Sequence, residues 1–116
     1  MMTRESLLRQ TCRHLTQAAS ADETTNAMAV LSDWHIVDGK LVRLFRFSDY
    51  HQTLAFVNAI ADTIHKEDHH PELIVGYNRC EVRYDTHSVN EGKGGVSTND
   101  FICAAKIDAV FGSGFR

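Results

Sequence analysis

The stretch "DWHIVDGKLVRLFRF", residues 33–47, decides the fold of the chain. It holds two runs of strand-forming residues that meet at Asp38-Gly39, a pair that tolerates the positive φ of a two-residue hairpin turn. We therefore expect an antiparallel hairpin here, and the elements on either side of it are assigned outward from this point.

A second hairpin is expected later in the chain. "ELIVGYN" (72–78) is followed by "CEVRYDTH" (80–87), and Asn78-Arg79 is the expected turn. In "CEVRYDTH" apolar residues alternate with charged ones, so one face of the strand should be buried and the other hydrated. His87 falls on the hydrated face.

Three helices are expected around the hairpins. The first begins after Thr3, carries four apolar residues and fades near residues 19–26; these apolar residues are Leu7, Leu8, Cys12 and Leu15. The second follows Ser48 and should end before Pro71, because residues that precede proline avoid the helical region. Its apolar positions are Leu54, Val57, Ile60, Ala61 and Ile64. The third opens at Ser97 and Asp100, an S-x-x-D capping box.

The resulting order is α-β-β-α-β-β-α. Hairpins rather than crossovers join the paired strands, which predicts an α+β fold with a four-stranded antiparallel sheet and three helices on one face. Residues 1–116 should form a single domain. The bare sheet face and the edge strands need protection, so we expect a homodimer or homotetramer.

Composition excludes several classes of protein. The net charge of −3 and the scattered 12 Lys and Arg residues argue against direct nucleic-acid binding. The 3 cysteines form no CxxC pair, which argues against a disulfide framework or a thiolate metal site. The sequence begins without an apolar leader and has no run long enough for a membrane span, so a cytoplasmic location is expected.

The stretch "HKEDHHPE", residues 65–72, concentrates histidine at the end of the second helix. Imidazoles titrate near neutrality and suit general acid–base catalysis, and His87 is the expected partner of this cluster from the end of its strand. Histidine is also common at helix C-termini because it interacts with the last carbonyls. A metal could bind His65 and His69 at i, i+4, although the glutamate of the zinc-protease pattern is missing. No sequence signature of a catalytic serine or cysteine appears.

"HHPE" at 69–72, Tyr77, His87 and the following "GVSTND" together resemble the pterin-4a-carbinolamine dehydratase family. The upstream stretch "LSDWHIVDGKLVRLFRFSDYHQTLAFVNAIA" is also similar to that family, so the resemblance covers about residues 31–111. It implies removal of water from a 4a-hydroxytetrahydropterin, a by-product of aromatic amino acid hydroxylases, without a metal or redox cofactor. It also implies a link to such a hydroxylase.

The resemblance implies three catalytic histidines, His69, His70 and His87, with Asp100 as the associated acid. We expect His70 and His87 to transfer protons and His69 to orient the pterin. The expected substrate-binding residues are His65, Pro71, Glu72 and Tyr77. Asp100 could instead serve only its capping box, and Tyr77 only packing.

The chain departs from the family pattern in three places. His65 stands where the family has an acid, Leu73 stands where it has tryptophan, and the loop that contains "NEGKGG" is about four residues longer. The alternative function is a non-catalytic one, as a dimerisation or assembly cofactor for a protein partner on the same fold. A metal-binding module is the third reading.

Overall fold

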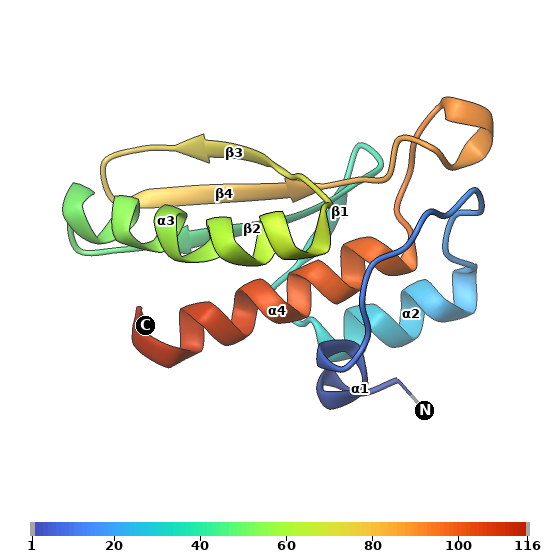
Figure 1. Cartoon of the computed structure of the whole chain (residues 1–116), viewed down its shortest axis with the longest axis horizontal. Coiled ribbons are helices and arrows are strands. Elements are labelled where there is room, and N and C mark those ends of the chain that lie inside the picture. Colours follow the sequence, from blue (N-terminus) through green and yellow to red (C-terminus); the bar gives the residue numbers. More distant parts are fainter. Residues whose placement is uncertain (1, 116) are drawn as a thin grey trace.

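The computed structural model describes residues 2–115 and confirms the predicted α+β class. The four strands form one antiparallel sheet in the order β1-β2-β4-β3, and the helices lie on one side of it (Figure 1). The elements are α1 (Arg4–Leu8), α2 (Ala21–Val30), β1 (His35–Val37), β2 (Lys40–Arg46), α3 (Tyr50–Glu67), β3 (Glu72–Val75), β4 (Arg79–Tyr84), the short 3-10 turn η1 (Asn90–Gly92) and α4 (Thr98–Gly114).

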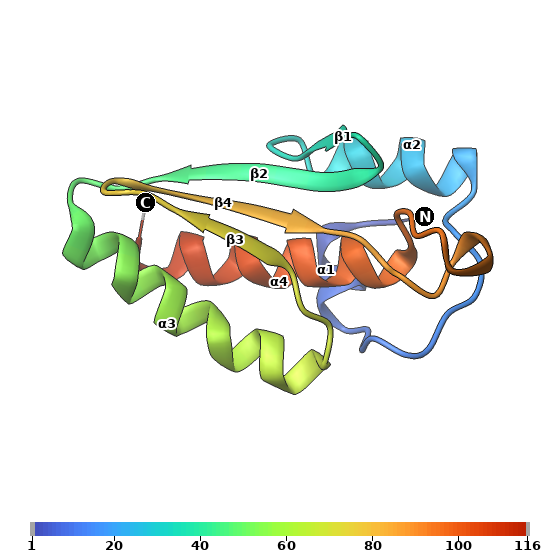
Figure 2. The same ribbon diagram turned by 90° about the horizontal axis from the view of Figure 1, so that it is seen from above.

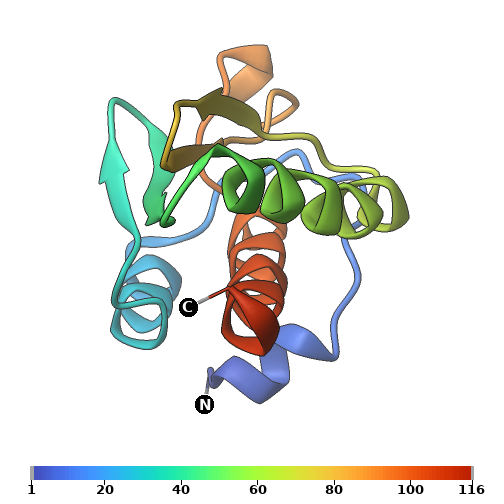
Figure 3. The same ribbon diagram turned by 90° about the vertical axis from the view of Figure 1, so that its left-hand side faces the viewer.

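The helices form a layer beneath the sheet. Figures 2 and 3 show α4 in the middle of this layer, with α3 toward the β3 edge and α2 toward the β1 edge. The short helix α1 packs on the side of α4 that faces away from the sheet. No helix of residues 2–115 covers the opposite face of the sheet, as the alternating pattern of β4 predicted.

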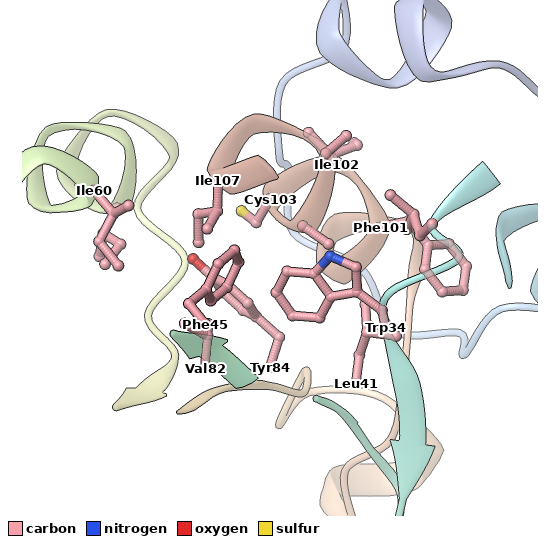
Figure 4. Packing of buried hydrophobic residues seen from close by; sticks show 14 of the residues in the cluster. Trp34, Leu41, Phe45, Ile60, Val82, Tyr84, Phe101, Ile102, Cys103 and Ile107 are labelled. Atoms are coloured by element: carbon pink, nitrogen blue, oxygen red, sulfur yellow. The ribbon is translucent and has the colours of Figure 1, made fainter. Parts of the chain in front are cut away.

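The first hairpin has the predicted turn. Asp38 and Gly39 both adopt positive φ, at 51° and 75°, and join β1 to β2. Alternate residues of β2 then point toward the helices, and Leu41 and Phe45 lie opposite Tyr84 and Cys80 of β4. These side chains are almost completely buried and form the core around Trp34 with residues of α4 (Figure 4).

The predicted first helix is wrong in its extent. It ends at Leu8, and residues 9–19 form an extended segment that we call the strap. A separate helix, α2, occupies the polar stretch where the first helix was expected to fade. Its start is fixed by a reciprocal capping box between Ser20 and Glu23, an S-x-x-E signal that the apolar pattern concealed.

The expected long helix is present as α3, but its ends and part of its buried face differ from the prediction. Its cap is Asp49 rather than Ser48, and Asp68 ends it in the left-handed conformation. Leu54 is 38% exposed, whereas Phe56 is fully buried, so the apolar stripe is rotated from the predicted one.

The second hairpin turns one residue earlier than predicted. The amide of Gly76 donates to the carbonyl of Arg79 at 2.8 Å, so Tyr77 and Asn78 are the central residues of the turn. Tyr77 is therefore at the tip of the hairpin, where it is 66% exposed.

A buried carboxylate on α4 ties the first third of the chain to the core. Asp108 accepts hydrogen bonds from Arg4 at 3.1 Å, from the indole nitrogen of Trp34 at 2.9 Å and from Arg43 at 2.7 Å. Its side chain is only 6% exposed. Three donors compensate for the loss of water around this charge.

Candidate active site

The three predicted catalytic histidines line a single pocket of about 580 Å³. This volume is in the range typical of small-ligand sites. The pocket lies where α3 and β4 end, beside the start of α4 and the strap. Its lining residues are Cys12, Arg13, His14, Leu15, Asp68, His69, His70, Asp85, Thr86, His87, Ser88 and Asn99.

The end of α3 sets the position of the adjacent pair His69 and His70. Asp68 has φ 49° and ψ 42°, a left-handed conformation that turns the chain off the helix axis. Pro71 follows directly and leads into β3. The two histidines are therefore held between a helix C-cap and a proline rather than within the last turn of the helix.

His69 is anchored by a buried carboxylate. Its Nε2 lies 2.6 Å from Oδ1 of Asp100, which is fully buried. An ionised carboxylate can only accept hydrogen bonds, so the proton of this bond belongs to Nε2 when Asp100 is ionised. Nδ1 is then the ring nitrogen of His69 that remains for a ligand.

Asp100 also has the capping role that its sequence position predicts. Its Oδ2 accepts from the amide of Ser97 at 2.8 Å and from the hydroxyl of Thr86 at 3.0 Å. One oxygen of this carboxylate therefore caps the start of α4, and the other binds His69. The capping role and the association with the histidines, both considered from the sequence, are compatible.

Tyr84 supports His69 from inside the core. The two rings stack with centroids 5.1 Å apart, and the tyrosine hydroxyl donates to the carbonyl of His69 at 3.1 Å. Tyr84 is fully buried, and this burial raises the pKa of its phenol far above the usual range. It is therefore a neutral donor that fixes the ring and backbone of His69.

His87 lies just beyond the end of β4 and lines the same pocket as His69 and His70. Its side chain is 90% exposed, and its Nε2 lies 3.6 Å from Oδ1 of Asp85. Asp85 also lines the pocket, so a carboxylate is near this imidazole as well. His69 is thus rigidly bonded, whereas His70 and His87 are open to solvent.

The four predicted substrate-binding residues lie outside the pocket lining. His65 is exposed on the last turn of α3, and Pro71 is half-buried beyond the two histidines. Glu72 is on the outer face of the sheet, where its Oε1 lies 3.8 Å from Nζ of Lys40. Tyr77 stacks on Tyr50 at the far end of α3, with ring centroids 6.4 Å apart.

Sequence reasoning missed the contribution of the strap. Four of its residues line the pocket, yet apolar spacing had assigned them to the first helix. Asp85 and Thr86 could have been found from their position beside His87. Among residues 2–115, no group of three or more His, Cys, Asp or Glu side chains is arranged to hold a metal ion.

Comparison with known proteins identifies the family of the chain. The model of the family described as pterin 4 alpha carbinolamine dehydratase matches residues 17–110. The chain belongs to this family. A relative from Bdellovibrio bacteriovorus, named "Putative pterin-4-alpha-carbinolamine dehydratase", is 53% identical over 99% of this chain and 96% of its own length. A relative of the same name from Nitrosospira multiformis is 47% identical over 86% of this chain and 85% of its own length.

A solved structure has the pterin-4-alpha-carbinolamine dehydratase fold seen here. The "transcriptional coactivator/pterin dehydratase" from Brucella melitensis superposes with a TM-score of 0.72 at 33% identity. The match covers 81% of this chain and 98% of the other. The strap residues that line the pocket precede the part of the chain that the family model matches.

Proposed function

We propose that the chain is a 4a-hydroxytetrahydrobiopterin dehydratase, a lyase that acts in the recycling of tetrahydrobiopterin. The observation that carries this proposal is the convergence of His69, His70 and His87 on one pocket, with His69 bonded to the buried Asp100. Membership of the dehydratase family gives the substrate class.

The reaction breaks the bond between C4a of the pterin and its hydroxyl oxygen. An imidazolium donates a proton to that hydroxyl, which leaves as water. A neutral imidazole accepts the proton of N5, and the electron pair of that N–H bond forms the double bond of the quinonoid dihydropterin. The two proton transfers balance, and each imidazole can recover its starting state by exchange with water.

His70 and His87 are the proton-transfer residues in this proposal. Both are open to solvent, which allows them to exchange protons between turnovers. His69 orients the pterin, because the bond to Asp100 fixes the ring and leaves Nδ1 for a hydrogen bond to the substrate.

The test follows the ultraviolet absorbance of a 4a-hydroxytetrahydropterin that a hydroxylase generates in the assay, with a chelator present. Wild type should accelerate its decay, and His70→Ala or His87→Ala should each lose about 10²–10⁴-fold of that acceleration. His51→Ala is the matched control, since His51 is an exposed histidine on the first turn of α3. Full activity in both pocket variants would disprove the histidine mechanism, and loss of activity on chelation would favour a metal site.

A protein-binding role is the second candidate. The name of the Brucella structure includes a coactivator role, and the outer sheet face of this chain exposes apolar side chains at Val37, Leu44 and Ile74. A homodimer or homotetramer would cover such residues. Light scattering that gives the mass of a monomer at micromolar concentration would contradict the oligomer.

The proposed cellular setting is the cytoplasm, near an aromatic amino acid hydroxylase that generates the substrate. No helix within residues 2–115 has the length and hydrophobicity that a membrane crossing requires. Co-purification of a hydroxylase activity with the chain would support this link, and a membrane-bound pool after cell fractionation would oppose the location.

A further inference from the structure

The strap brings two basic side chains to the pocket from the opposite end of the sequence. Arg13 and His14 line the pocket together with the histidines near residues 69 and 87. In Figure 1 the blue chain between α1 and α2 passes the first turns of α4 and approaches the loop that follows β4. The match of the family model begins at residue 17, so Arg13 and His14 precede it.

The backbone of the strap is fixed at three residues by side chains from other parts of the chain. The amide of Cys12 donates to Glu67 at 2.9 Å, and the amide of Arg13 donates to Oδ1 of Asn99 at 3.2 Å. The amide nitrogen of the Asn99 side chain donates back to the carbonyl of Arg13. Ser88 donates to the carbonyl of Leu15. A segment held at residues 12, 13 and 15 has a defined backbone, from which the exposed side chains of Arg13 and His14 reach the pocket lining.

Asn99 is well placed to hold the backbone of the strap. It is only 5% exposed, and its side chain satisfies both backbone groups of one strap residue, Arg13. It directly precedes Asp100, which binds His69. The first turn of α4 therefore positions the strap with one residue and a catalytic histidine with the next.

The charge of Arg13 suggests what the strap binds. The guanidinium is always protonated, and it forms no ion pair with any carboxylate of residues 2–115, whereas Asp85 in the same lining is near His87. Guanidinium groups bind carboxylate and phosphate oxygens through paired hydrogen bonds. The expected ligand group is therefore an anion at the strap side of the pocket.

We propose that Arg13 and His14 form a binding subsite for an anionic substituent of the pterin, a carboxylate or a phosphate, and that Asn99 positions this subsite. The inference rests on the proposed function, because the histidine trio would hold the pterin ring. It keeps the dehydration chemistry of that function but changes the substrate: the dihydroxypropyl substituent of tetrahydrobiopterin is uncharged, whereas this subsite favours related pterins whose substituent carries a negative charge.

The test measures equilibrium binding of three stable fluorescent probes: 6-carboxypterin, the phosphate ester of 6-hydroxymethylpterin, and neutral 6-hydroxymethylpterin. Wild type should bind at least one anionic probe about tenfold more tightly than the neutral probe, and Arg13→Gln should remove this preference while it retains binding of the neutral probe. The anionic probe that shows the larger preference identifies the carboxylate or the phosphate as the ligand group. Arg9→Gln is the matched control, because Arg9 is an exposed strap residue outside the pocket lining.

The role of Asn99 is tested by the same ratio of affinities. Asn99→Ala should reduce the preference for the anionic probe with Arg13 intact, and raised ionic strength should reduce it in wild type. Equal affinity of wild type for all three probes, or an unchanged preference in Arg13→Gln, would overturn the subsite. If wild type binds none of the probes and does not dehydrate the substrate, the proposed function fails as well; dehydration without a charge preference overturns the subsite alone.

Discussion

Replacing Asp100 by asparagine should reverse the proton positions on His69 while it keeps the start of α4. The amide of Ser97 can only donate, so the oxygen of the new side chain must remain on that side. Its NH₂ group then faces Nε2 of His69, which was 2.6 Å from a carboxylate oxygen. The imidazole can satisfy this donor only if its own proton moves to Nδ1.

The expected cost of Asp100→Asn follows from the bonds that change. A substrate group that donates to Nδ1 of His69 in wild type would face an N–H group there in the variant. The lost hydrogen bond should weaken transition-state binding by about 1.5–3 kcal/mol. This loss corresponds to a decrease of roughly 10- to 100-fold in kcat/KM. The free energy of unfolding should fall by only about 1–2 kcal/mol, because a charge-assisted hydrogen bond is replaced by a neutral one.

Three measurements check this prediction together. Dehydratase kinetics give kcat/KM, urea unfolding gives the stability, and ¹⁵N NMR of labelled histidine reports which ring nitrogen of His69 carries the proton. Asp62→Asn, at an exposed position on α3, is the matched control and should change none of the three. Wild-type kinetics in Asp100→Asn, with Nδ1 of His69 protonated, would refute the orienting role.

The other predictions concern stability and thiol access. Burial acts to raise the pKa of Glu67, but hydrogen bonds from Lys106 and the strap outweigh it and hold the pKa below the usual 4.5. Glu67→Gln should therefore lower the free energy of unfolding by about 1.5–3 kcal/mol at pH 7 in urea titrations, and this difference should shrink as the pH falls below 4.5. Asp108→Ala should cost about 3–5 kcal/mol by the same measurement, because it leaves buried donors, including Trp34, without a partner. In native protein a maleimide should label Cys12 alone, as mass spectrometry of peptides would reveal, since the other two thiols are fully buried.

Each of these predictions has its own control. A constant difference between wild type and Glu67→Gln from pH 7 to pH 3 would contradict the linkage. Asp33→Ala removes a more exposed partner of Arg43, at 3.7 Å, and should cost less than about 1 kcal/mol. Labelling of all three thiols at equal rates in native protein would mean that the core around Cys80 and Cys103 opens readily.

Local chemistry explains why most of the fold could be predicted. Asp38-Gly39 fixes a turn that few other pairs allow, and the alternation in β4 fixes which face of the sheet is buried. The proline at 71 requires α3 to end before it. These signals depend on neighbours a few residues apart. The expected partnership of His87 with the adjacent pair depended instead on the end of its strand, which lies beside the end of α3.

The strap could not be predicted because distant residues determine its conformation. The bonds of Cys12 to Glu67 and of Arg13 to Asn99 join residues 55 and 86 positions apart. They satisfy backbone groups that a helix would otherwise pair, so the apolar spacing of the segment misleads. Tyr77 lies outside the pocket lining because the six residues from Pro71 to Tyr77 include the whole of the extended strand β3.

The left-handed residue at 68 and the proline at 71 leave the backbone of the adjacent histidines little torsional freedom. We expect the backbone of residues 68–71 to keep its conformation during turnover. Substrate and product should then enter and leave on the exposed side of the pocket, where His70 and His87 lie, because the strap is also held, through the bond of Ser88 to the carbonyl of Leu15. Two walls of the pocket thus have a fixed backbone, and exchange with solvent requires only the exposed histidine side chains to move.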